Sequence, residues 1–104
     1  MGKYVLVFKG GGIPQSEEEQ KRVMEAWGAW FGSLGESVVD AGNPFGASSA
    51  IGGDGSVNGG APSALTGYSI VNADSLDDAV TKSKGCPILE GGSGSIEVYE
   101  TMEM

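Results

Sequence analysis

Two repeats of the order strand, helix, strand account for the hydrophobic pattern of the chain. The first begins at Tyr4–Phe8, an apolar run that predicts a strand with two apolar faces, because successive side chains point to opposite sides. A helix over Ser16–Leu34 and an extended segment near Val38 and Val39 complete the repeat. In a small domain, a strand with two apolar faces needs cover beyond its own helices, and a second subunit would supply it.

The predicted first helix carries an apolar stripe. Ser16 is its expected N-cap and Gly35 its expected C-cap, since they lie where the helical pattern begins and ends. Large apolar residues recur at spacings of three and four, namely Val23, Trp27, Trp30 and Leu34, with Met24 and Phe31 beside them. We expect this stripe to pack in the core, and stacking of the two tryptophans on an aromatic ligand is the alternative.

A segment rich in glycine, serine and alanine, residues 48–64, separates the two repeats. Just before it, Pro44 lacks a backbone N–H, so the preceding strand is expected to end, or to lie at a sheet edge, near Asn43. Within the segment two short strands are predicted to pair across a turn: Ser49–Ile51 and Ser56–Val57, with the turn at Gly53–Gly55. The sequence therefore predicts one domain over residues 1–104 with an inserted, projecting β-hairpin.

The second repeat starts with a strand around Tyr68–Val71. Asp74 or Ser75 is expected to cap the following helix, which stops at Gly85. Its inward face is predicted to consist of Leu76, Ala79 and Val80. The alternation of Ile96–Tyr99 predicts the last strand.

Composition narrows the possible partners. The 104-residue chain has 14 acidic and six basic residues, a formal charge of -8, which disfavours binding to nucleic acid and to anionic membranes. No apolar stretch approaches the length of a membrane span, and the N-terminus does not resemble a signal peptide. One cysteine cannot form an internal disulfide framework. We expect a cytoplasmic protein.

Candidate chemical motifs have simpler structural interpretations. Lys9–Pro14 is glycine-rich and lies between a strand and a helix, but the third glycine of a GxGxxG motif would fall at Gln15, so a turn is predicted. Cys86 has no histidine to activate it and is expected to be a small buried apolar residue. Because the chain has no histidine and one cysteine, neither a metal nor a cofactor is expected.

Four stretches of the chain resemble a known family. They read YVLVFKGG, AWGAWFGSLGESVVDAGNPFG, TGYSIVNADSLDDAVTKSKGCP and GSIEVYE, and they cover nearly the whole chain. They are similar to the YCII-related family, also called the DGPF-domain family, most specifically in the SLDDA, CP and IEV elements. The resemblance implies an α+β fold, a ferredoxin-like βαββαβ unit whose antiparallel sheet packs against that of a second subunit to form a dimeric α/β barrel.

The chain departs from the family pattern in two ways. In place of the Asp-Gly-Pro-Phe segment before the third core strand it reads Asn58–Pro62. Some relatives have a histidine and aspartate pair proposed as catalytic, and this chain has no histidine. An activity that depends on that pair is therefore not expected here.

Two functions are consistent with these observations. One is a homodimeric module that binds a small molecule, or acts in an interaction, at a cleft between the two sheets. The other is an enzyme in which Asp40, its pKa raised by burial, acts as a general base. We favour the module, because a lone general base has no recognisable catalytic partner.

A small-molecule site is predicted on the sheet face between subunits. It comprises Asp40, Asn43 and Tyr68, with Lys9 at its rim, since polar groups at a strand end lie beside a tyrosine with an aromatic ring and a hydroxyl. The alternative is structural: Asn43 caps a turn, Asp40 is a solvated edge charge and Tyr68 packs in the core.

Overall fold

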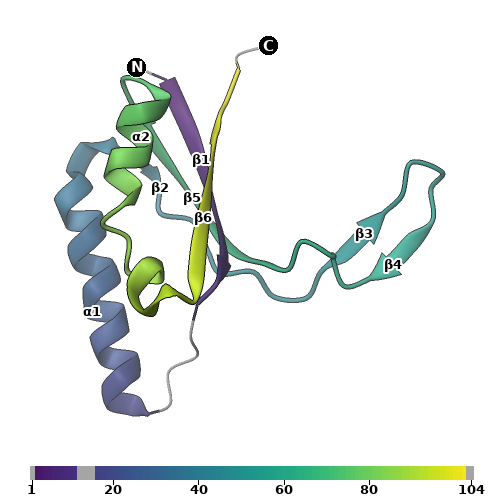
Figure 1. Cartoon of the computed structure of the whole chain (residues 1–104), viewed down its shortest axis with the longest axis horizontal. Coiled ribbons are helices and arrows are strands. Elements are labelled where there is room, and N and C mark those ends of the chain that lie inside the picture. The colour runs from purple at the N-terminus through teal and green to yellow at the C-terminus, as the bar shows by residue number, and fades with distance from the viewer. Residues whose placement is uncertain (1, 12–15, 103–104) are drawn as a thin grey trace.

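The chain forms an α+β structure in which two helices lie on the same side of an antiparallel sheet (Figure 1). The structure is a computed structural model that describes residues 2–11 and 16–102. Its helices and strands are β1 (Gly2–Gly10), α1 (Glu17–Leu34), β2 (Val38–Asp40), β3 (Ser49–Ile51), β4 (Val57–Gly59), β5 (Leu65–Ala73), α2 (Leu76–Ser83) and β6 (Gly94–Glu100). Short 3-10 helices follow α1 at Gly35–Ser37 and α2 at Pro87–Gly92.

The four-stranded sheet has the order β2-β5-β1-β6, and each neighbouring pair is antiparallel. Its centre is the long pairing of β1 with β5, in which Leu6 lies opposite Ser69 and Val7 lies opposite Tyr68. Because directly opposed residues point to the same face, alternate residues of the two strands lie on the same face of the sheet. Leu6 and Ser69 are fully buried beneath the helices, whereas Val7 and Tyr68 are half-buried on the opposite face.

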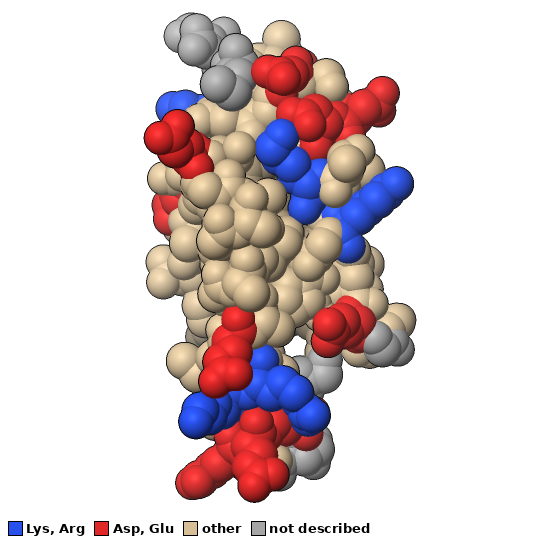
Figure 2. Space-filling model, turned by 90° about the vertical axis from the view of Figure 1, so that its left-hand side faces the viewer, with Lys and Arg blue, Asp and Glu red and all other residues tan. Residues whose placement is uncertain are grey.

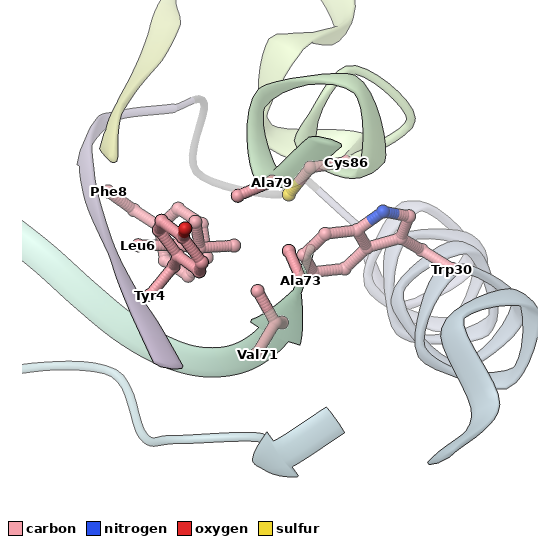
Figure 3. Packing of buried hydrophobic residues seen from close by; sticks show 8 residues of the cluster. All are labelled: Tyr4, Leu6, Phe8, Trp30, Val71, Ala73, Ala79 and Cys86. Carbon is pink, nitrogen blue, oxygen red and sulfur yellow. The ribbon is translucent and has the colours of Figure 1, made fainter. Parts of the chain in front are cut away.

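The core lies between this sheet and the two helices (Figure 3). Its buried apolar residues come from β1, β5, both helices and the loop after α2: Tyr4, Leu6, Phe8, Trp30, Val71, Ala73, Ala79 and Cys86. Figure 3 shows Trp30 reaching from α1 toward Cys86 and Ala79 on the α2 side. The Trp30 indole N–H donates to the carbonyl of Lys82 at 3.1 Å, which joins the two helices directly.

Both helices begin at the predicted caps. The Ser16 hydroxyl accepts from the Glu19 N–H at 3.1 Å, and Gly35 ends α1 with a positive φ of 55° while its N–H donates to Phe31. At α2 the Ser75 hydroxyl accepts from the Asp78 N–H, and the Asp78 carboxylate in turn accepts from the Asp74 N–H, both at 3.0 Å. These reciprocal bonds satisfy N–H groups that have no partner within the helix.

The predicted apolar stripe of α1 is buried over part of its length. Trp30 is buried, and Trp27, Phe31 and Leu34 pack against the core. The prediction was wrong for the start of the stripe, because Val23 is 36% and Met24 is 67% exposed. In Figure 1 the first turns of α1 extend beyond the end of the sheet, so these side chains have less of the sheet to cover them.

The inward face of α2 also differs from the prediction. Ala79 is fully buried, but Leu76 and Val80 are 45% and 38% exposed, and Ser83 takes the second inward position at 4%. Ala79 and Ser83 are small residues four apart, so they lie on one helical face and allow α2 to approach the sheet closely. The larger residues lie at the rim of that contact.

The predicted hairpin is present and projects from the sheet (Figure 1). Ile51 of β3 lies opposite Val57 of β4, and both are largely exposed. The turn between them is held by Asp54, whose carboxylate accepts from the N–H and hydroxyl of Ser56 at 2.9 and 2.7 Å. The hairpin is therefore ordered by its own hydrogen bonds.

The second face of the sheet has an apolar centre, as predicted for β1, with Glu97 opposite Val7 and Lys9 farther along the strand. Val5, Val7 and Ile70 are half-buried there and Tyr99 is 54% exposed, and both described helices lie on the other side. No helix in the described part of the chain is long and apolar enough to cross a membrane. Of the predicted turn at Lys9–Pro14, the positions from Gly12 onward lie outside the described residues.

The two tryptophans of α1 should differ in their contribution to stability. Trp30→Ala should lower the free energy of unfolding by about 3 to 5 kcal/mol, because it removes a buried ring and leaves the Lys82 carbonyl without its donor. Trp27→Ala should have a smaller effect, about 1 to 3 kcal/mol, because Trp27 is only partly buried. Urea unfolding followed by circular dichroism measures both, and equal losses would contradict this assignment.

Candidate functional site

A cavity of about 540 Å³ lies between α1 and the sheet, at the end of the sheet where β1 finishes and β5 begins. One wall comes from α1 and β1, the other from the loop after β2 and the start of β5. Its lining residues are Phe8, Met24, Trp27, Phe31, Ala41, Gly42, Asn43, Pro44, Thr66, Gly67, Tyr68, Ser69 and Ile88. The exposed Met24, Asn43 and Pro44 border its opening.

Three aromatic rings form the first wall. Trp27 meets Phe8 edge to face, with ring centroids 5.3 Å apart and planes at 77°. Phe31 lies 5.9 Å from Trp27 with its plane tilted by 37°. Such edge-to-face and tilted contacts are favourable for aromatic rings and fix their orientation. The cavity is therefore bounded by rings held in place by one another.

The second wall depends on two glycines. Gly42 has a positive φ of 78°, and a Cβ there would collide with the carbonyl oxygen of Tyr68. A Cβ on Gly67 would meet the Asn43 carbonyl oxygen at 3.2 Å and the Phe8 ring at 3.5 Å. The glycines thus let the loop after β2 lie directly against β5. Pro44 pairs with Gly67 at this sheet edge, which agrees with the predicted end of the strand near Asn43.

Most polar groups of the cavity already have hydrogen-bond partners. The Ser69 hydroxyl donates to the Ala41 carbonyl at 2.7 Å, and the Thr66 hydroxyl donates to the Gly10 carbonyl at 3.3 Å. Within the described residues, the Asn43 amide and the Trp27 indole N–H have no such partner. None of the lining residues is Asp, Glu, Lys or Arg.

The four predicted site residues occupy different positions. Asn43 and Tyr68 belong to the cavity lining, whereas Asp40 and Lys9 do not. The Tyr68 side chain, however, lies with Val7 on the opposite face of the sheet, so Tyr68 borders the cavity through its backbone. Asp40 is exposed at the end of β2, where one carboxylate oxygen accepts from the Gly42 N–H at 2.8 Å. Its other oxygen lies 3.5 Å from the Tyr68 hydroxyl, longer than a typical O–H···O bond. Lys9 is exposed near the end of β1, where it pairs with Leu65 and Ser95.

Several cavity residues were not predicted as site residues. Met24, Trp27 and Phe31 have helical spacing that places them on one face of α1, so the sequence contains part of the signal. Their position across the cavity from the start of β5 depends on pairing between distant segments, which the helical spacing does not encode. The stacking of Phe45 on Tyr68, at 5.8 Å and 18°, also follows from the loop conformation and was missed.

The charged residues lie away from the centre of this side of the molecule. Figure 2 looks onto the α1 side and shows charges gathered at the two ends, with a broad uncharged area between them. The sequence agrees, since the second half of α1 and its C-cap, residues 26–35, contain no charged residue.

Cys86 and the acidic residues do not form a reactive centre. Cys86 is 2% exposed, and burial raises the pKa of its thiol to about 11. It therefore stays protonated near neutral pH, as expected for a buried apolar residue. Among the described residues, no cluster of three or more acidic or cysteine side chains could hold a metal ion.

The thiol of Cys86 should resist alkylation in the native protein. Iodoacetamide at pH 8 should leave Cys86 unmodified over the time in which a small thiol reacts fully. The reason is that the Cys86 side chain is buried and its thiol stays protonated at this pH. In urea it should react completely, as intact-mass measurement would show. Fast alkylation without denaturant would mean that Cys86 is accessible.

Comparison with other proteins found no matching family model and no matching curated sequence. The resemblance to the YCII-related family therefore stays a prediction from the four sequence stretches.

Proposed function

We propose that this protein is a small-molecule-binding module and that its ligand occupies the cavity beneath α1. The observation that carries this proposal is the aromatic wall of Phe8, Trp27 and Phe31 facing a loop and strand wall across about 540 Å³. Ligand pockets in proteins usually have volumes of about 300 to 1,000 Å³, mainly apolar walls and a few polar groups. The Asn43 amide and the Trp27 N–H are polar groups of that kind.

The position of Asp40 supports a binding function over a reaction in which Asp40 acts as the general base. A general base needs to reach the proton that it removes, and a buried site would raise its pKa toward neutrality. Asp40 is instead exposed, holds the turn at Gly42 and does not line the cavity. With the Cys86 thiol protonated, the described residues offer no activated nucleophile near the cavity.

We also propose the ferredoxin-like fold and the dimeric α/β barrel that the family resemblance implies. The order β2-β5-β1-β6, with antiparallel neighbours and both helices on one face, supports the first. The second is supported by the apolar face opposite the helices, where Val5, Val7 and Ile70 are half-buried and Tyr99 is exposed. A second copy of the sheet would cover this face.

A thermal-shift screen against small molecules tests the binding function and its location. A ligand present at a hundred times its Kd should stabilise the protein by about 2.7 kcal/mol, a shift on the order of 10 °C in Tm. Asn43→Ala and Met24→Ala, which alter the cavity lining, should reduce that shift. Asp40→Asn and Lys9→Ala should keep it, because neither residue lines the cavity.

The same four variants separate the cavity from the predicted site on the sheet face. A ligand bound between two sheets near Asp40 and Lys9 would lose affinity in the second pair of variants. Equal shifts in all four would show that the ligand lies at neither place.

Equilibrium sedimentation at micromolar concentration tests the dimer. The wild type should sediment at about twice the chain mass of 10.6 kDa. Val5→Lys should give a folded monomer, because it places charge between Ile70 and Tyr99 on this face without touching the core beneath the helices. Val80→Lys, on α2 at the other side, is the matched control and should remain dimeric. A monomeric wild type would refute the dimer.

A further inference from the structure

The cavity offers no charge to a ligand. Its lining contains no Asp, Glu, Lys or Arg, and the nearest predicted site charge, Asp40, is already engaged at Gly42. A charged group moved from water into an apolar site without a partner loses much of its hydration free energy. A ligand that enters this cavity is therefore favoured if it is neutral.

The cavity also offers few hydrogen bonds. The hydroxyls of Ser69 and Thr66 donate to backbone carbonyls, and the backbone of the loop wall is paired with β5: Phe45 donates to Thr66 at 2.9 Å and Tyr68 donates to Asn43 at 3.4 Å. A sugar or another polyhydroxylated molecule would leave several of its own hydroxyls without partners, at a substantial loss of free energy for each. The ligand must gain most of its affinity from apolar contact.

Ring geometry favours an aromatic ligand among apolar ones. The nearly perpendicular rings of Trp27 and Phe8 present different orientations to the adjacent cavity, and Phe31 adds a third ring at a tilt. A planar aromatic molecule can make edge and face contacts with such a set, each adding to the gain from burial. A flexible aliphatic chain would gain burial alone and would lose rotational freedom.

We infer that the ligand is an uncharged, planar aromatic molecule with few polar groups. This inference rests on the proposed binding function and specifies its ligand class. The exposed side chain of Met24 at the opening, an adaptable thioether, is compatible with ligands of different outline.

Two fluorescent probes with the same skeleton test the inference. N-phenyl-1-naphthylamine is neutral, and 8-anilinonaphthalene-1-sulfonate carries one added sulfonate. The neutral probe should bind with one-to-one stoichiometry and at least about tenfold more tightly, because the sulfonate finds no partner in the cavity. Quenching of tryptophan emission by energy transfer reports the binding of either probe.

A charge at the opening provides the matched variant. Met24→Lys should reduce the preference for the neutral probe by about fivefold or more, as expected for one opposite charge beside the sulfonate. Val80→Lys is the control, because Val80 is an apolar residue on the other helix that is also exposed, at 38% against 67% for Met24, and that lines a separate hollow of about 290 Å³ between α2 and β6. It should leave the preference unchanged.

The outcomes separate the ligand class from the binding function. Equal affinity for both probes, with Met24→Lys changing it and Val80→Lys not, would refute the neutral class and retain the cavity as the site. A preference that responds only to Val80→Lys would place binding in the other hollow and would overturn both proposals. Failure of both probes to bind, with the thermal-shift screen also negative, would likewise overturn both.

Discussion

The antiparallel pairing of β1 with β5 is the constraint on which the rest of the structure depends. It places Leu6 opposite Ser69 and Tyr4 opposite Val71, so that both strands contribute alternate residues to the same core. A shift of one residue would move this entire set to the other face, which makes the register strongly determined. The same register places Val5 opposite Ile70 and Val7 opposite Tyr68, and so creates the apolar second face.

The two helices present residues of different size to the core, and the cavity lies beside the helix with the larger ones. The inward residues of α2 are small, Ala79 and Ser83, and both are nearly inaccessible to solvent. α1 instead presents large rings, and Trp30 extends far enough to bond the Lys82 carbonyl. A Cβ on Gly85 would lie 3.3 Å from the Trp30 ring, so the close packing there relies on glycine. Trp27 and Phe31 of the same helix border the cavity instead.

The sequence predicted the order of elements and the caps because these depend on local chemistry. Ser16, Ser75 and Gly35 act on backbone groups within a few residues of themselves, and the hairpin turn at Asp54 does the same. Burial was predicted less well, since Val23, Leu76 and Val80 have the correct spacing but are 36%, 45% and 38% exposed. Val23 lies near the start of α1, and Leu76 and Val80 lie at the rim of the α2 contact. Spacing identifies the face of a helix that points inward and leaves open how far the partner surface reaches.

The candidate site, too, could be predicted from the sequence only in part. Asn43 and Tyr68 were predicted for a site on the sheet face. In the structure Asn43 lines the cavity, while the Tyr68 side chain lies on the sheet face near Asp40. Phe8 belongs to the same cavity through the contact of its ring with Trp27 of α1. Such contacts depend on tertiary packing, so a local reading of the sequence assigns these rings to the core.

An open cavity of this size has an energetic consequence for so small a domain. A chain of about 100 residues buries less of its surface than a larger protein, and its stability is the small difference between large opposing terms. Rings that face open space forgo the dispersion contacts that a filled core would provide. A molecule that binds the folded state alone restores those contacts and stabilises the fold by mass action. Under the proposed binding function, the aromatic wall of Phe8, Trp27 and Phe31 would couple ligand occupancy to the stability of the α1 packing, through the same residues that connect the cavity to the core.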